Sequence, residues 1–384
     1  MEKTIVILGG GIGGVVAARE LRRNLGTRHR IVLIDRSDVH SFPPSYLWVM
    51  VGWRKPAAIL KPLPAMEKHG VEFYQATVRA IHPGEHRVET DRASFRYDYL
   101  VVALGAELLP QLVRGWAEGV HSFYTLEDVV KLRDALVSFS GGTIAIVIGD
   151  TPYKCPPAPY EAAFILESFF SHRTNGGTTI KVFTPEPAPL PAAGPAGAAM
   201  LSELLRRRRI ELHVSHKVSS ISSGSLGRRI SFENGASYEY DMLIFIPPHR
   251  PPQIVRAAGL TDGSGWVTVD PKSLRTQFPE VFAIGDVTTV RLPSGGTLPK
   301  AGVFAAGEAE TVAHNIASEL RTHAPLKDFG GMGHCYLETG YGRAGYIHGD
   351  FFAKPVPVVS VDEPSVAHHW KKVVFEKYWL WRWF

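Results

Sequence analysis

Short apolar runs alternate with a helically spaced stretch at the start of the chain, and they predict a strand, a helix and a second strand. Thr4 to Leu8 is strand-like, Val15 to Asn24 has helical spacing, and Arg30 to Ile34 is a second apolar run that ends at Asp35. These periods are the primary signal of secondary structure in a sequence. The order indicates half of a dinucleotide-binding unit.

The same alternation returns further along the chain. Val71 to Val102 is rich in strand-like segments, and helical and strand-like stretches then recur, which predicts a second βαβ unit inserted after the first. The expected helices are Leu126 to Phe139, Ala158 to Phe170 and Met200 to Arg208, and the expected strands are Thr143 to Ile148 and Thr179 to Phe183. The proline-rich stretch from Pro185 to Pro195 is expected to be a loop.

From Asp241 the pattern returns to strand, and Val281 to Asp286 precedes an expected helix from Gly302 to Arg321. We therefore predict an α/β fold of two Rossmann-like domains, in which the first is completed late, plus a C-terminal membrane-associating segment. The expected domains are residues 1–108 with 241–324, residues 109–240, and a C-terminal region of residues 325–384 that begins with β-like segments from Phe329 to Gly349.

The turn after the first strand contains the pattern Gly9-x-Gly11-x-x-Gly14. The first glycine permits a tight turn, the second lets the backbone approach a pyrophosphate, and the third lets helix and strand pack closely. The helix N-terminus supplies N–H groups to the phosphates. Asp35 follows Gly14 by 21 residues and could accept hydrogen bonds from ribose hydroxyls. This context predicts dinucleotide binding.

Two later segments distinguish a flavin from a nicotinamide. Ala283 to Asp286 resembles the second flavin motif of the disulfide reductase-like flavoproteins, which have two dinucleotide-binding domains, and Tyr97 to Gly105 resembles their intermediate strand-turn motif. The resemblance implies the FAD/NAD(P)-binding fold of that superfamily and FAD as the cofactor. The predicted FAD-binding residues are Gly9, Gly11, Gly14, Asp35, Arg36, Pro44, Val78, Ala103, Gly105, Gly285, Asp286 and Lys300.

The second βαβ unit lacks a comparable glycine turn. Its first strand runs into Gly149 to Pro157, where one glycine remains and three prolines and Asp150 occupy the stretch that would cradle phosphate. Proline has no N–H to offer a pyrophosphate, and the acid would repel one. Tight NAD binding is therefore not expected there.

A cysteine occupies this altered turn. Lys154 to Glu161, which contains Cys155, closely resembles the cysteine loop of the sulfide:quinone oxidoreductase and flavocytochrome c sulfide dehydrogenase family. Cys335 follows the late flavin motif, as in that family, and Pro299 to Gly302 resembles its segment near the flavin ring, so that the resemblance covers essentially the whole chain. It implies that the two cysteines form a disulfide or a polysulfur bridge on one face of the flavin, which sulfide opens.

The implied chemistry needs two thiols and a flavin. Hydrosulfide attacks one sulfur to leave a persulfide, and the freed thiolate can pass an electron pair to the flavin, which can release two electrons to a quinone. By resemblance Cys335 is assigned to the flavin side and Cys155 to the sulfur-carrying side. Glu161 and Lys300 complete the predicted catalytic set, with Glu161 as a proton-transferring carboxylate, although a structural role is weighed equally for both. Two buried free thiols are the alternative to a redox pair.

The departures from the family also carry expectations. Many quinone-reducing relatives have a further cysteine in the stretch that corresponds to His121 to Thr125, where this chain has none. Because no cysteine is left over for a covalent bond, we expect non-covalent FAD. No metal site is expected, since two cysteines 180 positions apart fit no zinc pattern. For Lys154 and His334, a solvated surface position is favoured over a role as a cation that lowers a thiol pKa.

Composition bounds the partners. The 384 residues are 45% hydrophobic, enough for two cores, and the net charge of +5 favours an anionic partner such as an acidic lipid surface. We expect no nucleic-acid partner, and an association of identical chains is left open. No run reaches the roughly 18 apolar residues of a membrane span. The first strand begins at Thr4, which leaves no room for a secretory signal, so a cytoplasmic start is expected.

The C-terminal segment from Trp370 to Phe384 mixes aromatic and cationic residues. Trp and Tyr favour the lipid headgroup region, and about fifteen helical residues could lie in the interface without spanning it. This favours a monotopic anchor on the cytoplasmic side of the cell membrane, and the alternative is a tail whose aromatics pack on the protein or on a second subunit.

Three functional hypotheses follow. The first is a peripheral membrane sulfide:quinone oxidoreductase, with sulfide and a membrane quinone as partners. The second is a type II NADH:quinone oxidoreductase, which the proline-broken second turn disfavours. The third is a non-enzymatic flavoprotein subunit that docks on a partner through the aromatic tail.

Overall fold

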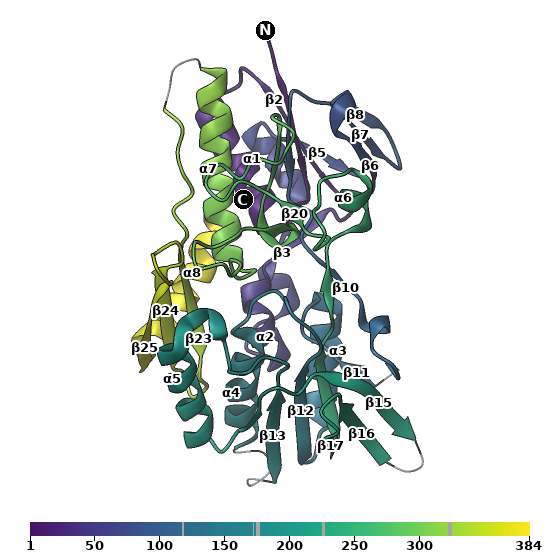
Figure 1. The fold of residues 1–384 in the computed structure, drawn as a ribbon, viewed down its shortest axis with the longest axis vertical. Helices are drawn as coiled ribbons and strands as arrows, with labels where there is room; N and C mark the ends of the chain where they lie inside the picture. The colour runs from purple at the N-terminus through teal and green to yellow at the C-terminus, as the bar shows by residue number, and fades with distance from the viewer. Residues whose placement is uncertain (117–118, 172, 174–176, 225–226, 322–324) are drawn as a thin grey trace.

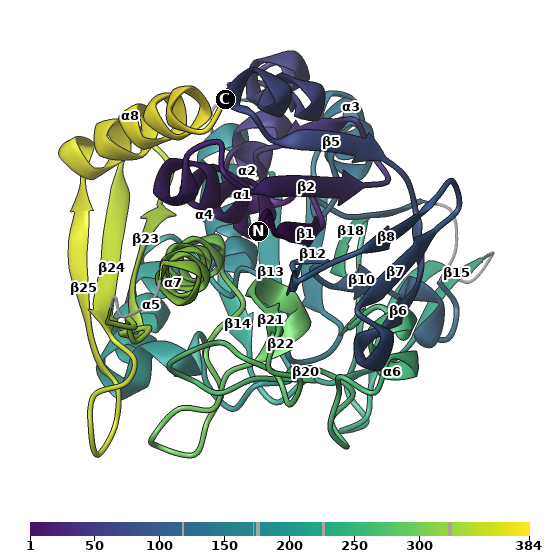
Figure 2. The same ribbon diagram turned by 90° about the horizontal axis from the view of Figure 1, so that it is seen from above.

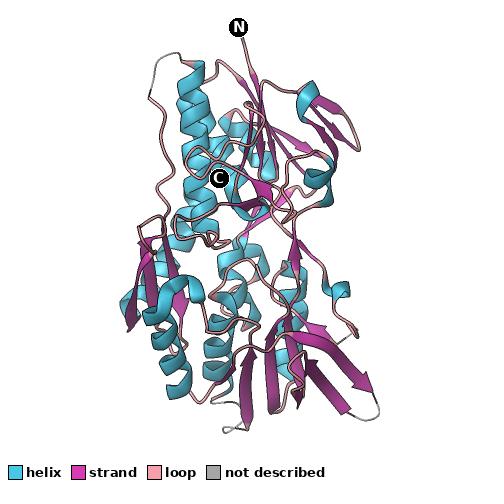
Figure 3. Cartoon of the chain, viewed as in Figure 1, coloured by secondary structure: helices cyan, strands magenta, loops and turns pink. Residues whose placement is uncertain are grey.

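Two parallel sheets organise the computed structural model, which describes residues 1–116, 119–171, 173, 177–224, 227–321 and 325–384 (Figures 1 and 3). One sheet lies in the upper half of Figure 1 and the other in the lower half, and the C-terminal sheet flanks them. Most residues of the inner strands of both sheets are buried, as expected of parallel strands covered on both faces. The predicted α/β fold with two Rossmann-like units is confirmed.

The first sheet has the order β21-β9-β1-β2-β5, and all its strand pairs are parallel. The helices α1 and α7 pack against each other beside it. Its elements are β1 (Thr4–Leu8), α1 (Ile12–Leu25), β2 (Arg30–Asp35), β5 (Glu72–Gln75), β9 (Tyr99–Val102), β21 (Val281–Ala283) and α7 (Gly302–Leu320). A small antiparallel sheet consists of β6 (Val78–His82), β7 (Arg87–Thr90) and β8 (Ser94–Arg96).

The second sheet has the order β11-β18-β12-β13-β14, again with parallel pairs. Its elements are β11 (Val120–His121), α3 (Leu126–Ser138), β12 (Gly142–Ile148), α4 (Ala158–Phe170), β13 (Thr178–Phe183), α5 (Gly194–Arg207), β14 (Glu211–His213) and β18 (Met242–Ile246). An antiparallel meander follows β14 and consists of β15 (Val218–Gly224), β16 (Gly227–Phe232) and β17 (Ser237–Glu239).

Shorter elements connect these units. They are β3 (Val39–Ser41) with β4 (Leu60–Pro62), α2 (Tyr46–Met50), β10 (Glu107–Leu108) with β19 (His249–Arg250), α6 (Gln253–Ala257), and β20 (Val267–Thr268) with β22 (Thr288–Thr289). The C-terminal sheet consists of β23 (Met332–Glu338), β24 (Ala344–Asp350) and β25 (Val358–Ser365), and the helix α8 (Val366–Arg382) follows it. Figure 2 shows α8 at the outer edge of the molecule, beside α1.

The structure differs from the predicted domain boundaries at one place. The expected return to the first domain at Asp241 is wrong for β18, which pairs with β11 and β12 in the second sheet. Its five residues are all buried and apolar, a pattern that suits a central strand of either sheet and so does not identify the sheet. The chain returns to the first sheet only after Ile246, at β21. The expected boundary at residue 324 lies outside the described residues.

Two helices begin earlier than predicted. α1 begins at Ile12, and its first turn includes Gly13 and Gly14, although glycine is a poor helix former. α5 begins at Gly194 and takes the end of the expected loop, with a proline in its first turn, a position that tolerates proline.

Candidate functional site

The turn between β1 and α1 carries the glycine pattern. Gly10 N donates to Asp35 Oδ2 at 2.5 Å, so that the acid at the end of β2 holds the turn. A Cβ on Gly14 would lie 1.8 Å from Gly9 O, and only glycine lets α1 approach β1 so closely. A Cβ on Gly11 would meet nothing within 4 Å, because this position faces a cavity. The turn therefore fits a pyrophosphate at the N-terminus of α1.

We name this cavity, of about 270 Å³, the central cavity. The start of α1, the ends of β9 and β21, the start of α7 and the cysteine loop all contribute to it. The predicted site residues that line it are Gly11, Pro44, Ala103, Gly105, Cys155, Glu161, Gly285, Asp286 and Lys300. Segments that are far apart in the sequence thus converge on one space in front of the glycine turn.

Other predicted cofactor residues lie outside this lining. Gly9 and Gly14 form the interior of the turn, and Asp35 holds it through the backbone of Gly10. Arg36 is exposed after β2, and Val78 begins β6. A dinucleotide is longer than the central cavity, and its adenosine part would extend out of the cavity past the glycine turn, toward the end of β2.

The late glycine motif is held by a buried carboxylate. Gly285 N donates to Glu308 Oε2 at 2.5 Å, and Glu308 lies on α7. Burial raises the pKa of Glu308 to about 7. The prediction missed Glu308. A single acid on an apolar face of an expected helix was the available signal, because such a residue usually holds a backbone donor in the core.

Lys300 is also buried and acts on the same loop. Its Nζ donates to the backbone oxygens of Asp286 and Thr288, both at 2.8 Å, and lies 3.5 Å from the centroid of the Trp266 ring. Burial lowers the pKa of Lys300 to about 8. The side chain thus fixes the loop after β21, and it also lines the central cavity.

The cysteine loop replaces a phosphate-binding turn. β12 ends at Ile148 but α4 begins only at Ala158, whereas β1 and α1 are separated by the short glycine turn alone. Cys155 has a φ of +52°, its N–H donates to Lys300 O at 2.6 Å, and its carbonyl accepts from Ala158 N at 2.9 Å. These contacts hold Cys155 at the N-terminal end of α4 with its side chain against the central cavity.

Both cysteines line a second, apolar space of about 60 Å³, which we name the sulfur crevice. Cys155 comes from the loop before α4 and Cys335 from β23, and Phe304, Ile347 and Phe351 are among the apolar residues around them. Burial raises the pKa of Cys155 well above its ordinary value, and the Cys335 thiol and Glu161 raise it further. Burial also raises the pKa of Cys335, to about 12.

This apolar crevice favours uncharged sulfur. Cys155 lines both the crevice and the central cavity, so the cavity linings give no separate support to the assignment of Cys335 to the flavin side.

A buried ion pair joins the cysteine region to the C-terminal helix. Lys372 Nζ on α8 donates to Glu161 Oε1 at 2.7 Å, and the same oxygen accepts from Glu338 N at 2.8 Å. The Glu338 carboxylate in turn contacts His369 Nδ1 at 3.0 Å. Burial alone would lower the pKa of Lys372, but Glu161 and Glu338 outweigh it and raise this pKa.

Lys372 also lowers the pKa of both thiols against the effect of burial. The prediction missed Lys372 because it lies in a segment interpreted as a membrane anchor. The signal was the placement of Lys372, Glu376, Trp379 and Trp383 on one helical face.

The expected solvated position of Lys154 is wrong. Its side chain is half-buried and lines the central cavity, and desolvation lowers its pKa. The charge faces inward because the tight loop at Cys155 directs it toward the ring of Tyr124, whose centroid lies 5.9 Å from Lys154 Nζ. His334 is exposed, in line with its expected position, and it also lines the sulfur crevice.

The stretch where relatives have a further cysteine supplies Phe123 and Tyr124 to the central cavity. Tyr124 Oη is buried and has no hydrogen-bond partner among the described residues.

The helix α8 has two different faces. Its inner face packs on the first domain, where Trp379 stacks on His40 with the ring centroids 5.0 Å apart, and Glu376 accepts from Ser45 Oγ at 2.6 Å and from Arg54 Nε at 3.0 Å. His40 Nδ1 contacts Gly10 O in the glycine turn at 2.8 Å.

The outer face of α8 exposes Val366, Trp370, Val374, Tyr378 and Trp381 at helical spacing. We name these five residues the apolar stripe. The inner face fits a tail that packs on the protein, and the membrane interpretation stays a prediction for the outer face.

Comparison with known proteins identifies the family of the chain. Residues 3–309 match the family of pyridine nucleotide-disulphide oxidoreductases. The sulfide-quinone reductase of Aquifex aeolicus is 29% identical to the chain, covering 100% of it and 91% of the relative, and the mitochondrial sulfide:quinone oxidoreductase of mouse is 25% identical, covering 94% and 80%.

Among solved structures, the sulfide:quinone oxidoreductase of Aquifex aeolicus superposes with a TM-score of 0.88 at 26% identity, covering 99% of this chain and 91% of that one.

Proposed function

Since the chain belongs to the pyridine nucleotide-disulphide oxidoreductase family, we propose that it is a sulfide:quinone oxidoreductase that uses FAD, Cys155 and Cys335. The observation that carries this proposal is the placement of Cys155. It lines the central cavity in front of the glycine turn and also the sulfur crevice that it shares with Cys335. A sulfur atom bound there would lie between a substrate pocket and the cofactor site.

Separate groups of residues would bind the cofactor and carry out the chemistry on sulfur. The glycine turn and the start of α1 would bind the pyrophosphate of FAD, and Glu308 and Lys300 hold the loop after β21 against the same cavity. FAD, when bound, accepts two electrons and can release them to a quinone. The remaining chemistry takes place on sulfur and protons.

We propose that hydrosulfide attacks a sulfur of the oxidised cysteine pair, which leaves a persulfide on one cysteine and a thiolate on the other. Because burial opposes a thiolate in the crevice, the released charge needs a nearby cation. Lys372 is that cation, since it lowers the pKa of both thiols. Glu161 joins Lys372 to the cavity wall and is the proposed carboxylate for proton transfer.

An NADH-dependent reaction is less well supported. The segment from Gly149 to Pro157 holds a cysteine where a phosphate cradle would be, and Asp150 Oδ2 pairs with Arg250 Nη2 at 2.7 Å beside it. A pyrophosphate placed there would face an acid and prolines in place of backbone donors.

The acceptor is proposed to be a membrane quinone. No described helix combines the length and the apolar character that a bilayer span requires. The apolar stripe of α8 would instead lie in the headgroup region of the membrane, on the cytoplasmic side, with the inner face of α8 still packed on the protein. FAD is proposed to be non-covalent because both cysteines are used in catalysis. Flavin that stayed with acid-precipitated protein would contradict this.

The test is quinone reduction by sulfide in the wild type and in the variants Cys155→Ser and Cys335→Ser. We expect each substitution to abolish turnover, because serine forms neither the sulfur bridge nor a persulfide. Cys335→Ser and Cys155→Ser proteins that reduce quinone at the wild-type rate would exclude the proposal. Fast turnover with NADH and none with sulfide would favour the NADH:quinone alternative.

A further inference from the structure

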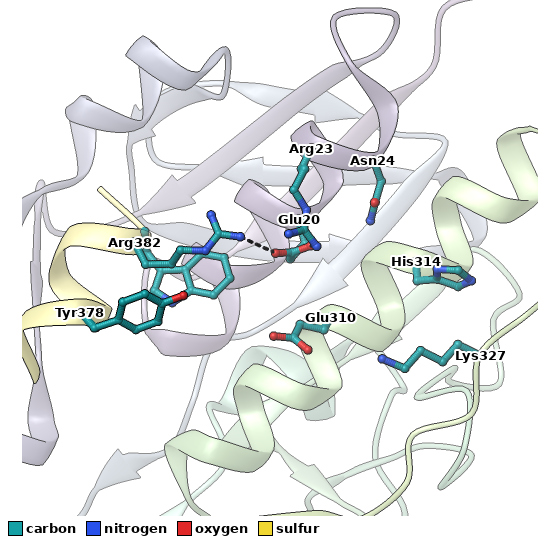
Figure 4. A pocket seen from close by; sticks show the side chains of 9 residues that line it. Glu20, Arg23, Asn24, Glu310, His314, Lys327, Tyr378 and Arg382 are labelled. Atoms are coloured by element: carbon teal, nitrogen blue, oxygen red, sulfur yellow. Dashed lines mark ion pairs between the residues drawn. The ribbon is translucent and has the colours of Figure 1, made fainter. Parts of the chain in front are cut away.

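A second cavity, of about 350 Å³, lies beside the C-terminal end of α8, where this helix meets α1 and α7. Figure 4 shows its side chains converging from the three helices and from the segment after α7 that carries Lys327. It shares no lining residue with the central cavity or the sulfur crevice. The proposed reaction therefore leaves it unexplained.

The lining is charged and incompletely paired. Glu20 on α1, whose side chain is only 5% exposed, pairs with Arg23 and lies 3.8 Å from Arg382 Nη2 on α8. Glu310 on α7 and Lys327 also line the cavity. Within the described ranges, neither of these two side chains has a hydrogen bond or an ion pair. Both side chains are exposed, and a ligand in the cavity can pair with them through opposite charges.

The net charge of the side chains that line the cavity indicates the charge of its ligand. Arg23, Lys327 and Arg382 bring three positive charges, and Glu20 and Glu310 bring two negative ones, so one positive charge is left over. A single phosphodiester would balance it, because arginine and lysine are the side chains that bind phosphate oxygens. Glu310 is left as an acceptor, which suits a ligand that also carries hydroxyl donors.

The cavity lies beside the apolar stripe, which favours a lipid as the molecule that carries the phosphodiester. Tyr378 belongs both to the cavity lining and to the apolar stripe, and Arg382 lies one helical turn after it. A molecule whose acyl chains lie in the bilayer beside the stripe can thus place its headgroup in the cavity. The cavity has the volume of about twelve liquid waters, which suits a glycerophosphate head of about ten non-hydrogen atoms.

We propose that this cavity binds the headgroup of phosphatidylglycerol, with the phosphodiester at Lys327 and Arg382 and the glycerol hydroxyls at Glu310. A zwitterionic phosphatidylethanolamine would bring its own cation and leave the charge of the cavity unbalanced. The inference rests on the proposed contact of α8 with a membrane. It adds a specific lipid to a surface that would otherwise attract any acidic bilayer through net charge.

The test compares Lys327→Gln with Lys371→Gln. Lys371 is an exposed residue of α8 outside the cavity, and the two substitutions remove the same charge. Binding of the full-length FAD protein is measured to phosphatidylcholine vesicles that contain equal mole fractions of either phosphatidylglycerol or phosphatidylserine, two lipids of the same net charge. Loss of one lysine near an acidic surface weakens binding about fivefold on either vesicle.

We expect the wild type to prefer phosphatidylglycerol vesicles over phosphatidylserine vesicles. Lys327→Gln should abolish this preference, and Lys371→Gln should keep it while lowering both affinities alike. Wild-type protein that binds both vesicles equally would overturn the proposal, as would a preference that survives in Lys327→Gln. Soluble glycerol phosphate that displaces the protein from the phosphatidylglycerol vesicles at equal phosphate concentration would assign the cavity to a free metabolite and also overturn it.

The outcomes also separate this inference from the proposed function. Sulfide oxidation with a water-soluble quinone reports on the cysteines and FAD alone, and Lys327→Gln should leave it unchanged. Absence of that activity in the wild type would contradict the proposed function while the lipid preference stands. Absence of binding to every vesicle would contradict the membrane contact itself and the lipid site with it.

Discussion

Replacing Lys372 by methionine tests whether the C-terminal helix carries a buried charge into the cysteine region. The Lys372 and Glu161 side chains are 9% and 5% exposed, and their 2.7 Å contact is shared with Glu338 N. Removing the cation leaves a buried carboxylate without its ion-pair partner. Breaking a buried pair in this way costs about 3 to 5 kcal/mol, because the remaining charge keeps its desolvation penalty.

The double variant with Glu161→Gln gives the sharper result. With both charges gone, Glu161 no longer leaves an unpaired ion, and Glu338 keeps its contact with His369 Nδ1. Neutral replacements of a buried pair are often close to wild type in stability. We therefore expect most of the loss in Lys372→Met to be recovered in the double variant. Lys371→Met, on the exposed side of the same helix, should change stability by no more than about 0.5 kcal/mol.

The assay is urea unfolding of the FAD-bound proteins, followed by circular dichroism and flavin fluorescence, with the midpoints compared at equal slope. A Lys372→Met protein within about 0.5 kcal/mol of the wild type would show that the buried ion pair does not stabilise the fold. A double variant no more stable than Lys372→Met alone would also contradict the prediction.

Three further predictions use other parts of the structure. Gly11→Ala should leave the stability of the apoprotein unchanged, because its Cβ meets nothing within 4 Å, but it should abolish FAD retention, because the methyl group would occupy the pyrophosphate position. The ratio of flavin to protein absorbance measures FAD retention, and Gly84→Ala is the control, since a Cβ there also meets nothing within 4 Å. Full FAD retention in Gly11→Ala would contradict the prediction. Burial raises the pKa of Glu308 from 4.5 to about 7, so the folded apoprotein keeps a proton that the unfolded chain has lost, and stability falls as pH rises through this window. Glu308→Gln should remove about 3 kcal/mol of that fall, measured by urea unfolding at both ends of the window, and an unchanged slope would contradict it. Trp370 and Trp381 of the apolar stripe are 60% and 73% exposed. Replacing both by alanine should weaken vesicle binding at least about tenfold, while turnover with a water-soluble quinone stays constant. Unchanged vesicle binding would exclude the apolar stripe as a membrane contact.

The features that sequence patterns predicted are those determined by local chemistry. The glycine turn before α1, the late Gly285 motif and the altered turn at Cys155 each consist of a few adjacent residues whose types limit the backbone, and each lines or supports the central cavity. Parallel strands were also recognisable, because burial on both faces makes them continuously apolar.

The features that were missed depend on contacts between distant residues. Lys372 and Glu161 are separated by 211 positions, and only folding of α8 onto the protein makes the lysine a buried partner instead of a surface charge. Glu308 needed the backbone of Gly285 beside it, and Lys154 needed the tight loop at Cys155. The sheet that β18 joins was ambiguous for the same reason. Its apolar sequence indicates that the strand is buried but does not indicate which strands it pairs with.

If electrons enter at sulfur, sulfide must reduce the flavin through the two cysteines, and one anaerobic stopped-flow comparison shows whether it does. Sulfide and NADH are mixed separately with the oxidised protein, and the flavin absorbance is followed in the wild type, Cys155→Ser and Cys335→Ser. We expect rapid bleaching of the wild-type flavin by sulfide, slow or no bleaching by NADH, and loss of the sulfide reaction in both variants. Rapid bleaching by NADH with no response to sulfide, or wild-type sulfide rates in both serine variants, would contradict it.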